Sequence, residues 1–154
     1  THCFYEVFDS KDELLAAILE KQFKTAGEYL QRTIDPTSPP VDQVWAHVEE
    51  MINFCFDQRL DRAFALFATY WRSLLPHYRE LAERSVQALL LTLVNALAEG
   101  QARGVLRSPD PAADAMAIYH LITALFFDRP VNTVHREEMA STVRRFVARA
   151  LDLR

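Results

Sequence analysis

Glycine is scarce in this chain, which has three glycines among its 154 residues. A protein with many tight turns needs more of them, because glycine supplies the positive φ angles that such turns require. Period-two alternation of apolar and polar residues is also absent over any stretch long enough to predict a strand. These two absences exclude a turn-rich β protein and favour an all-α fold.

Cysteine is equally scarce, with Cys3 and Cys55 as the two examples. They form neither a disulfide framework nor a C-x-x-C pair, so the sequence predicts no disulfide and no zinc site. The signatures G-x-S-x-G, G-x-G-x-x-G, the P-loop, H-E-x-x-H and the paired E-x-x-H of di-iron bundles are missing too. We therefore expect no enzyme, no metal and no cofactor.

Charge and long hydrophobic runs set further limits. The net charge is −4, which does not predict a polyanion-binding protein from bulk charge. The longest uncharged run, Ser85–Ala98, is shorter than the roughly 20 residues of a membrane-spanning helix. The first residues are polar and show no signal-peptide pattern, so we expect a cytoplasmic protein. With 50% apolar and 25% charged residues, the composition fits one soluble globular domain.

Apolar residues recur at three- and four-residue steps along most of the chain, as in amphipathic helices. The segment 35–40, D-P-T-S-P-P, interrupts this pattern with prolines, which end helices. Pro76 is suited to the first turn of a new helix, and Pro130 stops a later one. The sequence predicts about six helices, over residues 10–34, 41–59, 61–75, 76–103, 111–128 and 136–151.

The helix expected over 76–103 is apolar on most sides between Val86 and Leu97, which is typical of a central helix. Gly100 and Gly104 end it. Their G-x-x-x-G spacing lies at a polar helix end, so we give it little weight as a dimerisation motif. Ser108 or Asp110 is expected to cap the next helix.

The N-terminal junction has the most specific local pattern. Ser10 stands three residues before Glu13, the spacing of a capping box that begins a helix. Phe8 before the cap and Leu14 after it are placed to form a hydrophobic staple. Residues 1–7 predict a short helix that is marginal alone. The pattern therefore fixes two helices at a defined angle.

The wording of residues 4–15, F-Y-x-x-F-x-S-K-x-E-L-L, strongly resembles the junction that closes the DNA-binding domain of tetracycline-repressor (TetR) family regulators. The passage 98–115, which contains E-G-x-x-x-G-x-L-R and D-P, is similar to the segment between their long central helix and their penultimate helix. Both occur in the family's order. With the helix count, the resemblance covers nearly the whole chain, although the first two helices of the DNA-binding domain have no counterpart.

The resemblance implies a TetR-like homodimeric repressor whose helix-turn-helix heads bind operator DNA and are released by an effector. Residues 1–9 would be the end of the recognition helix, and residues 10–154 the ligand-binding and dimerisation domain, with 10–34 as the connecting helix. The implied DNA-binding residues are Thr1, His2, Tyr5 and Lys11. Taken alone, Tyr5 equally fits a packed aromatic residue, and Lys11 a solvated surface lysine.

Aromatic residues crowd the middle of the chain more densely than one tight core accommodates, which is typical of a mainly apolar pocket with a few polar anchors. His47, His77 and Thr92 also fall on or near apolar faces. The resemblance places the pocket among these helices, and a bulky apolar or aromatic effector is expected. Each of these residues taken singly also fits plain core. The predicted pocket residues are Trp45, Phe54, Phe64, Phe67, Tyr70, Trp71, Tyr78, Asn95, Tyr119 and His120.

The last two helices are the candidates for a four-helix seam with a second copy. Small residues there permit close helix approach. The alternative is that the same face merely covers the central helix. The predicted interface residues are Leu121, Ala124, Leu125, Val143, Phe146, Val147 and Ala150.

Two functions remain open from the sequence. The first is a ligand-controlled DNA-binding transcriptional regulator. The alternative is a helical small-molecule carrier or sensor that does not bind DNA.

Overall fold

The structure, a computed structural model, describes residues 10–127 and 135–153, and of residues 58–77 it describes the backbone alone. Within these ranges all regular secondary structure is helical, which confirms the all-α prediction. The helices are α1 (Lys11–Thr33), α2 (Pro40–Phe56), α3 (Gln58–Ala102), α4 (Pro111–Phe127) and α5 (Arg136–Ala150).

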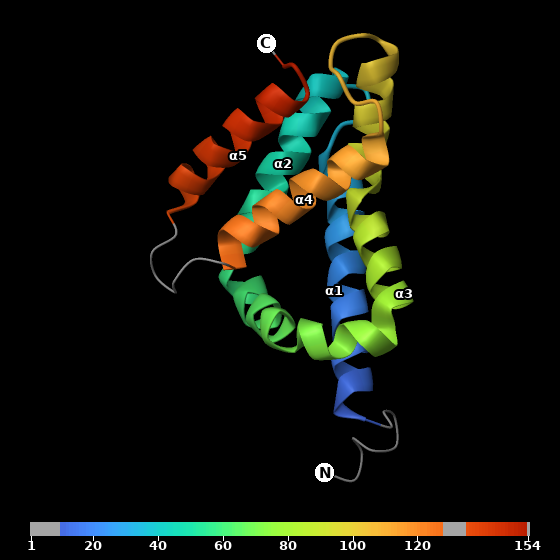
Figure 1. The fold of residues 1–154 in the computed structure, drawn as a ribbon, viewed down its shortest axis with the longest axis vertical. Coiled ribbons are helices and arrows are strands. Elements are labelled where there is room, and N and C mark those ends of the chain that lie inside the picture. Colours follow the sequence, from blue (N-terminus) through green and yellow to red (C-terminus); the bar gives the residue numbers. More distant parts are fainter. Residues whose placement is uncertain (1–9, 128–134, 154) are drawn as a thin grey trace.

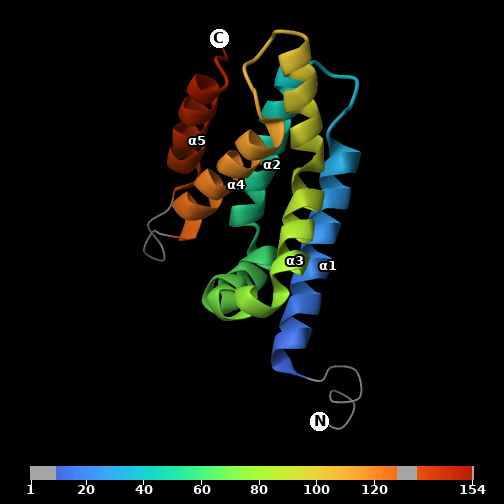
Figure 2. The same ribbon diagram turned by 45° about the vertical axis from the view of Figure 1, so that its right-hand side comes forward.

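The helices form an elongated bundle in which α1 and the second part of α3 run side by side along the long axis (Figure 1). α2 also packs against α3, α4 crosses α3 and α2 obliquely, and α5 covers α2 and α4 from outside (Figure 2). The first turn of α1 lies at one end of the bundle, and the loop between α3 and α4 lies at the other (Figure 1).

The start of α1 has the Ser10 cap that the sequence predicts. Ser10 has extended backbone angles, and its hydroxyl accepts a hydrogen bond from the Glu13 backbone N–H at 3.1 Å. Asp12 and Glu13 in the first turn place negative charge at the positive end of the helix dipole. The predicted N-terminal cap is therefore confirmed, whereas Phe8 of the expected staple lies outside the described residues.

The proline-rich stop after α1 is closed by side chains. The Asp35 carboxylate accepts from the Thr37 backbone N–H at 2.8 Å and from the Thr37 hydroxyl at 2.7 Å. The buried Gln43 amide in the first turn of α2 donates to the carbonyls of Pro36 and Ser38, at 3.2 and 2.7 Å. These bonds satisfy loop carbonyls that would otherwise lack partners and fix the turn from α1 into α2.

The two helices predicted over 61–75 and 76–103 both form, and they meet at a kink within α3. The kink is not at Pro76 itself; the departure from helical geometry comes two residues later, at Tyr78, with φ −123° and ψ 25°. Proline removes one backbone donor and crowds the preceding turn, which bends a helix without always ending it. Figure 1 shows α3 crossing the lower end of the bundle before it turns upward beside α1.

The loop after α3 shows which of the two candidate residues, Ser108 or Asp110, caps α4. Asp110 Oδ1 accepts from the Ala113 backbone N–H at 3.0 Å and so caps α4. Ser108 is fully buried; its hydroxyl donates to Asp114 Oδ2 at 2.6 Å, and its N–H donates to the Gln101 side chain at 2.6 Å. Gly104 has a φ of 67°, which suits glycine at a helix C-terminus.

The second part of α3, Tyr78–Ala102, is the helix of the described chain that is long and apolar enough, by length and composition, to cross a membrane. A core helix passes the same test. Here α1, α2 and α4 all pack against α3, and Leu93 and Leu97 are fully buried. The predicted central position of this helix is confirmed.

Gly27 lets α1 and α3 approach closely. A β-carbon on Gly27 would lie 3.1 Å from the Ala88 carbonyl oxygen and 3.6 Å from the Leu89 Cα. We expect Gly27→Leu to force α1 away from α3 and to lower the free energy of unfolding by about 1–3 kcal/mol, as overpacking does. Urea unfolding measures this loss. Thr25→Leu, at an exposed position on the same helix, is the control, and equal effects of the two changes would contradict the close contact.

Candidate functional site

The C-terminal ends of α2 and α4 approach each other (Figures 1 and 2). Aromatic side chains from the two ends meet there. The rings of Phe56 and Phe126 meet edge to face with centroids 5.8 Å apart, and Phe126 meets Phe127 in the same way at 5.3 Å. All three side chains are half-buried. Such pairs add to the stabilisation that burial provides. This aromatic end, defined by Phe56, Phe126 and Phe127, offers an apolar surface directly beside the segment 58–77.

Two ionisable groups lie buried next to the aromatic end. Burial raises the pKa of the Cys55 thiol to about 12. Burial also raises the pKa of Tyr119 to about 12, with a further upward contribution from the charge of Cys55. Both groups are therefore neutral at physiological pH, and this part of the interior has no formal charge to offer a ligand.

The most unusual polar group of the described interior is His47 of α2. Its ring is fully buried, and Nδ1 lies 2.8 Å from the Thr92 hydroxyl of α3. Its other nitrogen, Nε2, is the one buried side-chain nitrogen or oxygen in the described part of the chain without a hydrogen-bond partner. Burial lowers the pKa of His47 to about 4, so the ring is neutral at pH 7. A hydrogen-bonding atom held in apolar surroundings without a partner is costly, and native proteins contain few.

A polar cluster fastens the start of α5 to α2. The Arg136 guanidinium donates to Glu49 and, through Nε and Nη2, to Asn53 Oδ1 at 3.1 and 2.6 Å. Arg144, two turns along α5, donates to the second oxygen of Glu49 at 2.6 Å. Partial burial alone would raise the pKa of Glu49, but the hydrogen bonds from Arg144 and Arg136 hold it below its usual value. The cluster sets the position of α5 and offers no free group for chemistry.

The predicted pocket residues divide into several groups. Tyr119 is buried, while Trp45 and Tyr78 are half-buried. The Phe54 ring turns toward α1, where it meets Tyr29 at 5.7 Å, while the Tyr29 hydroxyl donates to Glu50 at 3.2 Å. The side chains of Phe64, Phe67, Tyr70 and Trp71 lie outside the described part.

Asn95 and His120 require a correction. Both side chains are exposed, on the outer sides of α3 and α4, so neither lies in the interior where the predicted pocket was placed. The interior polar pair is instead the buried His47 and the half-buried Thr92, which the sequence placed on or near apolar faces without singling them out. A helical rotation of about 100° per residue separates inward from outward positions, and a polar residue at the edge of an apolar stripe can fall on either side.

The predicted DNA-binding residues fall mostly outside the description. Thr1, His2 and Tyr5 are not among the described residues. Lys11 is the first residue of α1 and is exposed at the free end of the bundle. It lies beside the Ser10 cap, where helix N–H groups and a lysine ammonium together suit a phosphate.

The predicted dimer residues also separate into two sets. Val143 and Val147 are buried in the core of the single chain, so their apolar character is accounted for without a partner and they do not form an exposed seam. Leu121 and Leu125 are half-buried, whereas Ala124, Phe146 and Ala150 are exposed. The exposed part remains available to another molecule.

Phe146 stands at the edge of a shallow apolar hollow between α4 and α5. The hollow has a volume of about 210 Å³. Phe146 is 56% exposed, the most exposed large apolar side chain of the described residues. We call this surface the α4–α5 face, and it is lined by Asp114, Ala117, Ile118, Leu121, Phe146, Val147, Ala150 and Leu151.

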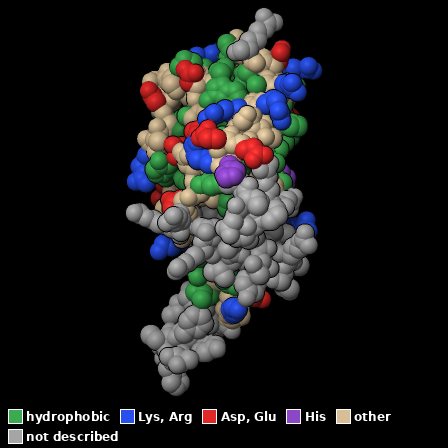
Figure 3. Space-filling model, turned by 90° about the vertical axis from the view of Figure 1, so that its left-hand side faces the viewer, with side chains coloured by type: hydrophobic (Ala, Val, Ile, Leu, Met, Phe, Trp, Pro, Cys, Tyr) green, Lys and Arg blue, Asp and Glu red, His purple; other side chains and the backbone are tan. Residues whose placement is uncertain are grey.

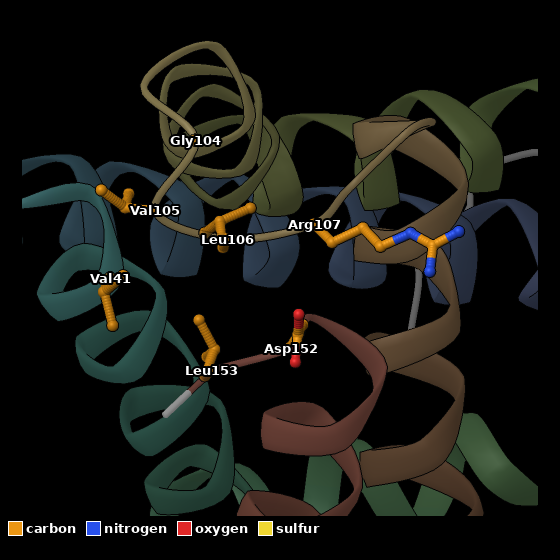
Figure 4. A pocket seen from close by; sticks show the side chains of 7 residues that line it. All are labelled: Val41, Gly104, Val105, Leu106, Arg107, Asp152 and Leu153. Atoms are coloured by element: carbon orange, nitrogen blue, oxygen red, sulfur yellow. The ribbon is translucent and has the colours of Figure 1, made fainter.

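A second hollow, of about 430 Å³, lies at the opposite end of the bundle from the start of α1. Figure 4 shows apolar side chains of Val41, Val105, Leu106 and Leu153 around it, with the Asp152 carboxylate nearby. The Arg107 side chain runs away from these apolar groups (Figure 4). One backbone pair beside this hollow is already hydrogen-bonded within the chain, since the Arg107 N–H donates to the Leu151 carbonyl at 2.8 Å.

Charged side chains of both signs are mixed on the described surface around α5 (Figure 3). Figure 3 shows acidic and basic side chains interspersed with apolar ones over the face that includes α5, without a field of one sign. In the described residues no group of three or more histidine, cysteine, aspartate or glutamate side chains could hold a metal ion.

No protein-family model, no curated protein and no solved structure matches the chain.

Proposed function

We propose that this chain is the effector-binding and dimerising part of a TetR-type, DNA-binding transcriptional regulator, a repressor that a small apolar or aromatic effector releases from DNA. The proposal rests on the resemblance of residues 4–15 and 98–115 to that family, and on an all-α bundle whose first helix begins at a capped junction. In such a regulator, the effector changes the position of α1, and α1 carries the DNA-reading head.

The contact between α1 and α3 is the observation that supports this coupling most directly. Gly27 brings the α1 backbone against the carbonyl of Ala88. One turn further along α3, Thr92 bonds to the buried His47 of α2. A displacement of α3 at Thr92 therefore acts on α1 through a backbone contact that has no soft side chain to absorb it.

The start of α1 suits the transmission of such a movement. Its first turn projects at the end of the bundle farthest from the α3–α4 loop (Figure 1). The Ser10 cap keeps that turn helical. A rigid helix end transmits rotation to whatever precedes it, whereas a frayed one would not.

The direct test is a gel-shift assay with full-length protein and the DNA upstream of its own gene. A regulator binds that DNA with an affinity that falls steeply as salt rises, since phosphate contacts release counterions. An effector should weaken binding. If no salt-sensitive complex forms with any added ligand, the regulator proposal fails and the alternative, a helical carrier or sensor, gains.

Loss of the α1 cap provides a sharper version of this test. We expect Ser10→Ala to fray the first turn at a cost of about 1 kcal/mol and to weaken DNA binding several-fold, while the remainder of the bundle stays folded. Ser10→Asp keeps an acceptor for the Glu13 N–H and should retain binding. Circular dichroism and the gel shift measure the two effects. Equal DNA affinity of the alanine and aspartate variants would contradict the role of the cap.

A further inference from the structure

The hollow beside the α3–α4 loop joins three segments that are far apart in the sequence. Residues 104–107 of the loop lie on one side of it, and Asp152 and Leu153, which follow α5, lie on the other (Figure 4). Val41, in the first turn of α2, completes the lining. We call this the C-terminal hollow. Its volume of about 430 Å³ falls in the range of pockets that bind small molecules, about 300–1,000 Å³.

Contacts within the chain hold the lining in place. The Arg107 N–H donates to the Leu151 carbonyl at 2.8 Å, and the Leu153 N–H donates back into α5, also at 2.8 Å. Leu106 is buried against Gly100 of α3, where a β-carbon would lie 2.6 Å from the Leu106 side chain. The C-terminal hollow is therefore already formed, and a ligand need not order it.

The backbone of the lining offers hydrogen-bond acceptors and few donors. The N–H groups of Gly104, Val105 and Arg107 all donate within the chain, as does that of Leu153. In contrast, no described residue donates a hydrogen bond to the carbonyl oxygens of Val105, Leu106 or Leu153. Acceptors that the chain leaves open suit a ligand that donates hydrogen bonds.

The charges around the C-terminal hollow favour a cation. Asp152 contributes an exposed carboxylate, while Arg107, the basic residue of the lining, runs away from the apolar groups (Figure 4). α3 and α5 both end at the hollow, and the C-terminal end of a helix carries partial negative charge. The start of α2 carries the opposite partial charge, which Asp42 in its first turn offsets. Of the neighbouring arginines, Arg103 is paired with Glu99, and neither it nor Arg149 lines the hollow.

We propose that the C-terminal hollow binds a small primary amine with an apolar body. The ammonium group lies against the Asp152 carboxylate and the open carbonyl oxygens, to which its three N–H groups donate. The body lies on the aliphatic side chains of the lining, which are Val41, Val105, Leu106 and Leu153. An anion is disfavoured, because it would meet a carboxylate and open acceptors. The hollow lies at the opposite end of the bundle from the start of α1, and the inference does not depend on the proposed function.

Three probes with the same phenylalkyl body test the proposal: 3-phenylpropylamine, the neutral 3-phenyl-1-propanol and the anionic 3-phenylpropanoate. Calorimetric titration of the full chain should show the amine binding about tenfold more tightly than the alcohol, because charge-assisted hydrogen bonds are the stronger ones. The acid should bind more weakly than both. In protein with ¹³C-labelled leucine and valine methyl groups, the ring of the amine should shift the resonances of Val41, Val105, Leu106 and Leu153.

Two substitutions separate the charged group from the apolar body. Asp152→Asn keeps a residue type that tolerates the φ of 53° at this position, and it should reduce the affinity for the amine about tenfold, to that for the alcohol. Val105→Ser, at a side chain that is 49% exposed, should weaken the binding of amine and alcohol alike. Asp12→Asn is the matched control, because it removes the same charge from an exposed aspartate at the other end of the bundle. It should leave all three affinities unchanged.

Several results would overturn the inference. They are absence of amine binding, an amine that binds no more tightly than the alcohol, an acid that binds as tightly as the amine, and retention of the amine preference in Asp152→Asn. Methyl shifts confined to residues outside the C-terminal hollow would also overturn it. The probes and the methyl resonances of the unmodified protein decide the question even where a variant does not fold. The gel shift tests the proposed function separately, so either conclusion can fail without the other.

Discussion

In the proposed homodimer, replacing Phe146 with glutamate is expected to separate the two copies into monomers. The ring is 56% exposed at the edge of the apolar hollow between α4 and α5, next to Ala150. On a two-fold axis, each copy would present the same ring and the same hollow to the other, so the face is suited to pair with itself. Exposed aromatic anchors of this kind dominate the energy of many interfaces.

The expected size of the effect follows from that anchor role. Loss of an aromatic hot spot costs at least about 2 kcal/mol, and two buried like charges add to it, so the dimer dissociation constant should rise on the order of 100-fold. Sedimentation velocity at micromolar concentration measures the change. The monomer itself should stay folded, because the side chain is largely outside the core.

Leu91→Glu provides the matched control. Leu91 is 47% exposed on α3, away from the α4–α5 face, so the substitution adds the same charge at a similarly exposed apolar position. It should leave the dimer unchanged. A monomer in the unmodified protein, or equal dissociation in both variants, would contradict the assignment of the interface.

Local features of the fold could be predicted from the sequence because they depend on neighbours a few residues apart. The Ser10 cap and the stop at residues 35–40 are of this kind, and both are present. Pro76 shows where local information ends. A proline predicts a break, but the packing around it decides where the break falls, and here the two parts of α3 meet at a kink at Tyr78.

Partners distant in the sequence could not be predicted. Arg136 and Glu49 are 87 residues apart, and periodicity shows which face of a helix is apolar without showing what it meets. For the same reason Val143 and Val147 fitted a seam with a second copy as well as they fitted the core they occupy.

The polar residues of the candidate site show the same limit. His47 and His120 both lie next to apolar stripes, yet one is fully buried and the other exposed. Only the angular position relative to α3 distinguishes them. The bond to Thr92, 45 residues away, makes His47 the polar centre of the interior.

Burial of His47 also predicts that mild acid destabilises the protein. The fold lowers the pKa of this histidine from its ordinary 6.5 to about 4, so the unfolded chain binds a proton more readily than the folded one. Stability is therefore complete above about pH 6.5, declines as pH falls, and loses no more from this group below about pH 4. From the pKa difference, the free energy of unfolding should drop by about 2 kcal/mol between pH 7 and 5.

Above pH 5 the effect of this histidine on stability can be measured apart from that of the carboxyl groups. Hydrogen bonds from Thr37 lower the pKa of Asp35, and the paired arginines lower that of Glu49, so both carboxyls lose their contributions only as pH falls below their ordinary values of 3.8 and 4.5. Urea unfolding at a series of pH values measures the slope. His47→Gln cannot be protonated there and should flatten the profile between pH 7 and 5, whereas His120→Gln, at an exposed position, should retain it. If the free energy of unfolding still falls between pH 7 and 5 in His47→Gln, another group supplies the acid sensitivity, because glutamine does not bind a proton when the chain unfolds.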